Sequence, residues 1–157
     1  MPKLPAKLHY ITELYDVNEQ ITPLKILAER ERASIYGLTG MVYTPYIDDY
    51  MEMCVKKAAI LVCLKKQGII EISEVERISA ALEDLHKRVK NNTVVEYDGR
   101  LYQRRFSPLK LSKSGKVVTK WARYWFLQLS NGKIDPHWES QVREIWPSYF
   151  LIRTVDL

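Results

Sequence analysis

The dipeptide Asp98-Gly99 lies between two runs of alternating residues, Thr93–Tyr97 and Arg100–Phe106. Aspartate followed by glycine favours a type I′ turn, because both central positions of that turn need a positive φ. The pattern therefore predicts a β-hairpin, so this chain is not expected to be helical throughout. The expected cross-strand pairs are Tyr97 with Arg100, Val95 with Tyr102 and Thr93 with Arg104.

The segment before this hairpin has helical periodicity. Ser73–Glu76 forms a capping box, in which a serine side chain and a glutamate side chain satisfy each other's backbone donors. Apolar residues then recur every three or four positions, which predicts a helix over 73–90. Thr44-Pro45 predicts a second helix over 45–67, and its apolar run Ala58–Leu64 is typical of a helix buried on all sides.

A similar cap and proline, Thr22-Pro23, predicts a short helix to about Arg32, preceded by loop with a short helix. Ser34 would cap another short helix to about Met41. The spacing of these two helices is similar to that of a helix-turn-helix. However, Ala33–Val55 contains no Lys or Arg, and a helix that reads DNA must approach phosphates. We therefore expect a plain helical hairpin.

The second half of the chain reads mostly as strands. A turn at Ser112–Gly115 leads into Val117–Leu129, which exceeds the usual strand length and is expected to be bent or partly helical. Asp135-Pro136 begins a short helix to about Trp146, and Tyr149–Val155 reads as a closing strand.

Together these elements predict an α+β fold. A helical N-terminal half, about 22–90, is expected to pack on an antiparallel β-rich C-terminal half, about 93–157. The 157 residues are within the range of a single domain, with two subdomains, 1–92 and 93–157, as an alternative division.

Charge is distributed unevenly along the chain. The net charge is +5, yet residues 87–133 alone hold 12 Lys and Arg against 2 Asp and Glu, a local excess of +10. Such an excess destabilises a folded chain by self-repulsion unless an anionic partner or counter-ions neutralise it. Nucleic-acid phosphate is the commonest such partner, and an acidic protein is the alternative.

The cations of this stretch form two candidate surfaces. The first is the expected helix end and hairpin, with Lys87, Arg88, Lys90, Arg100, Arg104 and Arg105. The second is Lys113, Lys116, Lys120 and Arg123, with Lys110 beside them. Trp121, Tyr124 and Trp125 are interleaved with this second set. Aromatic rings there would either stack on bases or form the protein core.

The order of a helix over 55–68, a helix over 72–92 and a hairpin with a basic tip over 93–106 resembles the second part of a winged-helix domain. The resemblance covers about fifty residues and rests on the order of elements. It implies that Lys87, Arg88 and Lys90 end a helix that reads duplex DNA, and that Arg100, Arg104 and Arg105 lie on the wing.

Motifs for catalysis are not found. The three histidines are isolated in sequence, and the glycines form no phosphate-binding loop. Cys54 and Cys63 are nine positions apart, on opposite faces of one helix, which favours two small buried residues over a metal site. We therefore expect no cofactor, no metal and no enzymatic activity. The apolar runs are too short to span a membrane and the start lacks a signal peptide, which predicts a cytoplasmic protein.

A different hypothesis uses the first third of the chain. Six of the ten tyrosines and all four methionines lie within residues 1–53. Tyrosine and methionine are enriched at protein interfaces. A small adaptor or inhibitor that binds another protein, or a homodimer, is therefore the alternative to nucleic-acid binding.

Overall fold

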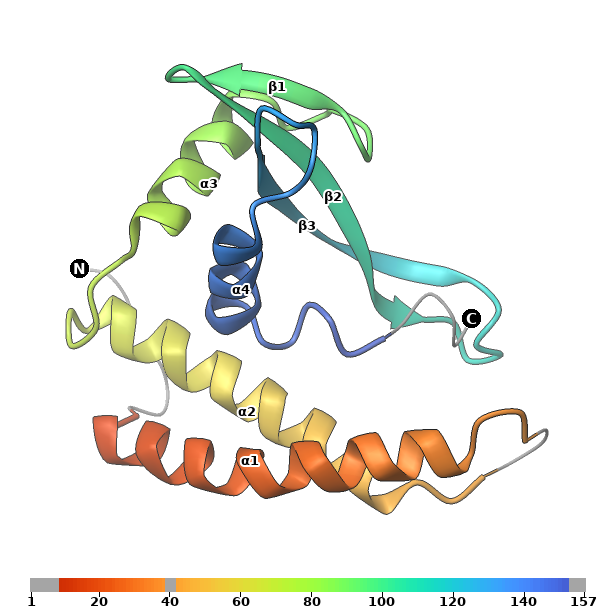
Figure 1. The fold of residues 1–157 in the computed structure, drawn as a ribbon. Coiled ribbons are helices and arrows are strands. Elements are labelled where there is room, and N and C mark those ends of the chain that lie inside the picture. Colours follow the sequence, from red (N-terminus) through yellow and green to blue (C-terminus); the bar gives the residue numbers. More distant parts are fainter. Residues whose placement is uncertain (1–8, 39–41, 153–157) are drawn as a thin grey trace. The chain divides into compact units, whose positions relative to one another are not determined.

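The computed structural model describes residues 9–38 and 42–152, and it confirms the α+β fold class. Three helices precede a three-stranded sheet, and one helix follows it (Figure 1). The elements are α1 (Ile11–Ser34), α2 (Pro45–Lys66), α3 (Glu74–Leu85), β1 (Val94–Tyr97), β2 (Arg100–Leu111), β3 (Val118–Gln128) and α4 (Pro136–Ile145). The chain divides into two compact units, residues 1–71 and 72–157, so α3 belongs with the sheet.

The first unit is a pair of antiparallel helices, α1 and α2 (Figure 1). The prediction for α2 is confirmed at both ends, since Pro45 begins it and Gly68 follows it with φ +75°. Leu14 and Val17 of α1 pack with Ile60 and Leu64 of α2. Both cysteines are free and buried, as the sequence predicts.

The prediction for α1 is wrong, because a single helix runs from Ile11 to Ser34 with Pro23 inside it. The apolar positions of α1 step by three and four residues straight through the proline: Ile11, Leu14, Val17, Ile21, Leu24 and Ala28. Packing of this row on α2 outweighs the one backbone hydrogen bond that proline removes. The helix expected from Ser34 does not form before Leu38, and Met41 lies outside the described residues.

Glu31, near the end of α1, has a role that its sequence context does not reveal. Its two carboxylate oxygens accept hydrogen bonds from the backbone N–H groups of Tyr46 (3.2 Å) and Ile47 (3.1 Å). These are orphan donors in the first turn of α2, where a negative charge is also favoured by the helix dipole. The carboxylate therefore caps α2 from the other helix of the pair.

Only one side of α2 is buried, which differs from the expectation of burial all round. Cys54, Ile60 and Leu64 are buried, whereas Val55 and Val62 are more than half exposed. A unit of two helices offers α2 one packing partner, so an apolar sequence on the opposite side stays at the surface.

The second unit contains an antiparallel sheet of order β1-β2-β3. The predicted hairpin register is confirmed, with Tyr97 opposite Arg100 and Val95 opposite Tyr102. Asp98 and Gly99 have φ values of +49° and +78°, as a type I′ turn requires. The core is formed by residues of α3, the two long strands and α4, among them Val75, Leu82, Tyr102, Trp125, Trp138 and Val142.

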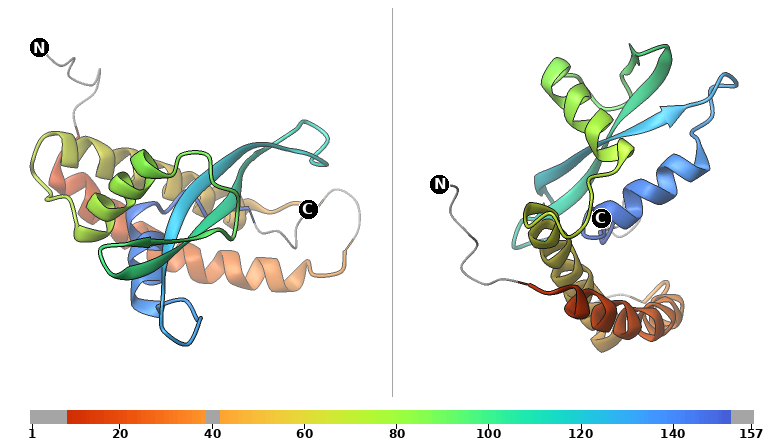
Figure 2. Two further views of the ribbon diagram at one scale, coloured as in Figure 1. Left: turned by 90° about the horizontal axis from the view of Figure 1, so that it is seen from above. Right: turned by 90° about the vertical axis from the view of Figure 1, so that its left-hand side faces the viewer.

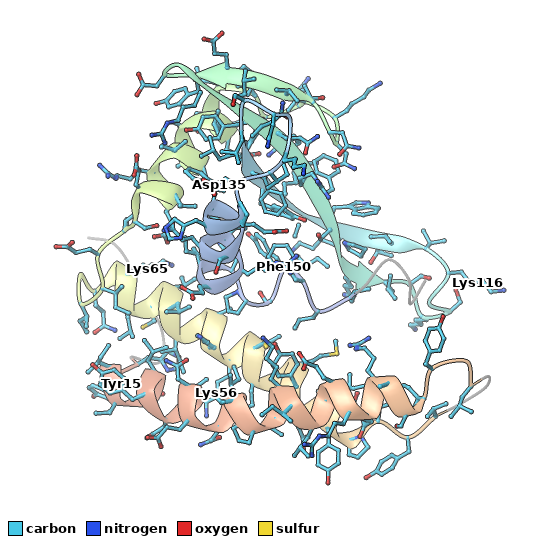
Figure 3. The ribbon with its side chains drawn as sticks, in the orientation of Figure 1. Tyr15, Lys56, Lys65, Lys116, Asp135 and Phe150 are labelled. Carbon is cyan, nitrogen blue, oxygen red and sulfur yellow. The ribbon has the colours of Figure 1, made fainter. Side chains whose placement is uncertain are left out.

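Two predictions for this unit need correction. Val118–Gln128 is a strand without a helical part, because β2 pairs with it along nearly its whole length, with register shifts opposite Pro108–Leu111. The segment after α4 forms turns and not a strand up to Ile152, and the rest of the expected strand lies outside the described residues. Phe150, labelled in Figure 3, and Tyr149 pack their rings on Tyr124 instead, at centroid distances of 5.0 and 6.3 Å.

The sheet changes from three strands to two along its length. β1 pairs with β2 only as far as Gln103, whereas β3 pairs with β2 as far as Leu111. We call residues 106–123, where β2 and β3 pair with each other alone and close through the turn at 112–117, the outer ribbon. Within its own unit this ribbon extends past α3 and α4 (Figure 2).

In the described part of the chain, no helix is both long enough and apolar enough to cross a bilayer.

Core packing of α3 gives a direct test of this fold. Leu82 is fully buried and Leu85, three residues on, is exposed. We expect Leu82→Ala to lower the free energy of unfolding by about 2–4 kcal/mol, since it leaves a cavity. Leu85→Ala should change it by less than about 0.5 kcal/mol. Urea titration followed by tryptophan fluorescence measures this unit alone, because all four tryptophans lie within residues 72–157. Equal losses in the two variants would contradict the packing described.

Candidate nucleic-acid interface

Helix α3 ends at Leu85, five residues before the predicted end at Lys90. His86 leaves the helical region at φ −134° and ψ 46°, and the residues up to Thr93 form turns. Lys87, Arg88 and Lys90 therefore lie in a loop, residues 86–93, and not on a helix. At this point a buried arginine of β2 donates hydrogen bonds to the backbone carbonyls of His86 and Lys87.

Arg104 is that residue, and it is completely buried, with 0% of its surface exposed. Its guanidinium forms a two-pronged ion pair with the Glu83 carboxylate and donates to the Lys87 carbonyl at 3.1 Å. It also lies over the ring of Trp125, 4.6 Å from the centroid. The expectation that Arg104 contacts phosphate is therefore corrected, because the side chain is inaccessible and both of its terminal nitrogens already donate to groups of the protein.

Glu83 responds electrostatically to this arrangement. Burial raises the pKa of its carboxyl, but the hydrogen bonds and charge of Arg104, with help from the Trp125 indole, outweigh burial. The net pKa therefore lies below its ordinary value. A depressed pKa means that the ionised pair stabilises the fold at neutral pH.

The three arginines of β2 do not form one surface. Neighbouring residues of a strand point to opposite faces, so Arg105 lies across the sheet from Arg104. Arg105 is half-buried, donates to Gln103 at 3.4 Å and lies over the ring of Phe126. Arg100 is exposed beside the Asp98-Gly99 turn, about 35 Å along β2 from the other end of that strand.

The remaining cations gather on the loop 86–93 and the outer ribbon. Lys87, Arg88 and Lys90 are all exposed. The loop is joined to the ribbon by two hydrogen bonds. Arg123 of β3 donates to the Lys87 carbonyl at 3.4 Å, and the Phe106 N–H donates to the Asn91 side-chain oxygen at 3.1 Å. The loop cations of the first predicted group therefore lie beside Arg123 of the second group, whereas the three arginines of β2 do not join them.

Four exposed lysines occupy the end of the outer ribbon. Lys110 and Lys120 are direct cross-strand partners, and Lys113 and Lys116 lie in the connecting turn (Figure 3 labels Lys116). Like charges placed opposite each other on two strands destabilise the pair. Residues 99–134 contain no Asp or Glu, so the ribbon offers these lysines no nearby carboxylate in sequence.

The aromatic residues of β3 are not all part of the protein core. Tyr124 and Trp125 are buried in the core. Trp121 is 46% exposed and lies between Lys120 and Arg123 on the strand. Its ring contacts Phe106 at a centroid distance of 6.4 Å, and the Arg123 guanidinium lies over that same phenylalanine at 5.5 Å. The sequence alone does not separate Trp121 from its buried neighbours, because all are large aromatic residues of one strand.

The resemblance to a winged-helix domain holds for the order of the elements alone. Its two helices fall in different units, and α3 buries Val75 and Leu82 in the core of the second unit. Within the described residues no group of three or more His, Cys, Asp or Glu side chains is placed to bind a metal ion.

The ion pair between Glu83 and Arg104 predicts a specific pH dependence. Glu83→Gln leaves a buried guanidinium without its counter-charge and should lower the free energy of unfolding at pH 7 by about 1–3 kcal/mol, which is less than for a fully buried pair because the Glu83 side chain is 39% exposed. Because the folded pKa of Glu83 is depressed, the wild type should lose this stabilisation as the pH falls below the ordinary value of 4.5 towards the folded pKa. The difference between variant and wild type should therefore shrink in acid.

Glu139→Gln is the matched control for that experiment. Glu139 pairs with Arg143 at 3.5 Å on the exposed side of α4, an arrangement worth less than about 1 kcal/mol. Urea titrations of both variants at pH 7 and pH 3.5 make the comparison. A Glu83 variant as stable as the control at pH 7 would show that the pair of Glu83 with Arg104 does not stabilise this unit.

Comparison with protein-family models, with curated proteins and with solved structures finds no match for this chain. The described surface combines a two-stranded ribbon, four lysines at its end and one exposed tryptophan beside a cationic loop.

Proposed function

We propose that the second unit binds nucleic acid without catalysis, and that it grips the phosphates of duplex DNA through the outer ribbon and the loop 86–93. The single observation that carries this proposal is the arrangement of Lys110, Lys113, Lys116 and Lys120 on a two-stranded ribbon. Each of these side chains is exposed and flexible enough to reach a phosphate.

The shape of the ribbon favours duplex DNA over RNA. The major groove of B-DNA is wide enough to admit a two-stranded β-ribbon, whereas the major groove of an RNA helix is too narrow for side chains to read. From Phe106 onwards β2 has β3 as its strand partner and β1 no longer widens the sheet. The lysines at the end of the ribbon would then face the phosphates that line the groove.

Electrostatic cost gives a second argument. The cross-strand pair of Lys110 with Lys120 stabilises neither strand, and binding to an anion removes its repulsion. Arg123 and the loop cations Lys87, Arg88 and Lys90 extend the positive surface along the ribbon. The geometry therefore supports a track of phosphate contacts and not a pocket for one small anion.

The exposed tyrosines of the first unit favour the alternative function of a small adaptor protein. Tyr36 and Tyr43 are 91% and 85% exposed, and Leu38 between them is also exposed. Exposed aromatic residues are typical of protein interfaces. A pull-down from the native host that depends on Tyr36 and Tyr43 would support this function in place of DNA binding.

DNA binding is tested by fluorescence anisotropy with labelled duplex DNA, single-stranded DNA and RNA at several salt concentrations. If the four ribbon lysines, Arg123 and Lys87 each contact a phosphate, log K should fall against log[salt] with a slope of about −5 for duplex DNA. The double variant Lys110→Ala/Lys120→Ala should flatten that slope by about two and should not weaken folding, because it removes a repulsion.

The matched control is Arg100→Ala/Lys133→Ala, which removes the same charge from exposed positions of the same unit outside the ribbon. Its slope should stay close to that of the wild type. Trp121→Ala distinguishes the binding of single strands from the binding of duplex DNA. If Trp121 stacks on the bases of a single strand, the variant should bind single strands more weakly by about 1–3 kcal/mol. Equal effects of the two double variants would mean that the charge of the chain, and not this ribbon, attracts DNA.

A further inference from the structure

A row of exposed side chains runs the length of α2 with the spacing of a coiled-coil seam. Successive members are four, three, four, three and four residues apart. We call this row the α2 seam, and its members are Asp48, Glu52, Val55, Ala59, Val62 and Lys66. This spacing keeps side chains on one stripe of a helix and is the repeat through which two helices pair.

The seam is a different surface from the one that α2 uses against α1. The residues buried in the helix pair include Ile60 and Leu64, whereas Val55 and Val62 are 55% and 53% exposed. Single exposed valines are common on protein surfaces. Two valines and an alanine in heptad spacing on one stripe are typical of a helix that packs against another helix.

Charge along the seam indicates which helix that is. Asp48 and Glu52 occupy its N-terminal end, Lys66 occupies its C-terminal end, and the apolar residues lie between. A helix with opposite charges at its two ends is complementary to a copy of itself that runs in the opposite direction. With a two-fold axis near residue 57, Asp48 of one copy faces Lys66 of the other, Glu52 faces Val62 and Val55 faces Ala59.

We propose that the α2 seam binds a second copy of this chain, with the two α2 helices antiparallel. Each copy brings its α1–α2 pair, so the first units of two chains would together form a four-helix arrangement. Ala59 allows close approach of the helices near the axis. Lys56, which is exposed beside the seam (labelled in Figure 3), meets its own copy there and opposes the association. This proposal is independent of DNA binding, which uses the other unit.

The experiment is sedimentation equilibrium of the full chain from about 5 to 500 µM. The mass should rise from 18.5 kDa towards twice that value as concentration increases. Val62→Asp should raise the dissociation constant at least about tenfold, because it places a second carboxylate opposite Glu52 of the other copy. Val117→Asp is the control, since Val117 is similarly exposed but lies in the turn of the outer ribbon. A mass of 18.5 kDa at every concentration would overturn the proposal.

Charge reversal tests the direction of the helices. Lys66→Asp should weaken the dimer, and the double variant Asp48→Lys/Lys66→Asp should restore it. Both helix ends lose a favourable interaction with the dipole in the double variant, so the recovery cannot come from a more stable helix. Lys56→Ala should tighten the dimer. If the pairing were parallel, Lys66→Asp and Asp48→Lys would each fail to be rescued by the other, which would also overturn the proposal.

Discussion

Arg104 is a charge that the protein has taken fully out of water, and the second unit is arranged around it. Glu83 at the end of α3 neutralises it, and Trp125 of β3 covers it. The carbonyl of Lys87 accepts one of its N–H groups, which holds the chain out of helical geometry at that point. One guanidinium thus fixes the end of α3, the path of the loop 86–93 and the contact between helix and sheet.

This constraint also shapes the candidate DNA-binding surface. Because α3 stops at Leu85, the cations that follow it are free to lie beside β3, where Arg123 joins them through the Lys87 carbonyl. The buried Arg104 therefore helps to position the exposed cations of the loop 86–93 beside the ribbon.

The sequence predicts the fold best where local chemistry decides the structure. The Ser73 capping box, the start of α2 and the type I′ turn at Asp98-Gly99 are all confirmed, because each depends on neighbouring residues. Pro23 misled the prediction for α1, since only packing on α2 shows that the apolar row passes through it. The sequence does not predict the burial of Arg104, because its counter-ion is 21 residues away in the chain. Burial of that kind is a tertiary property, and no local pattern reports it.

The outer ribbon has one further consequence, for the solubility of the protein. An open strand edge invites pairing with the edge of another chain, and β2 has no β1 beside it after Gln103. Three features work against such pairing. Pro108 has no backbone N–H to offer, the register shifts between Pro108 and Leu111, and Lys110 brings positive charge to the edge. This edge is therefore a poor template for aggregation.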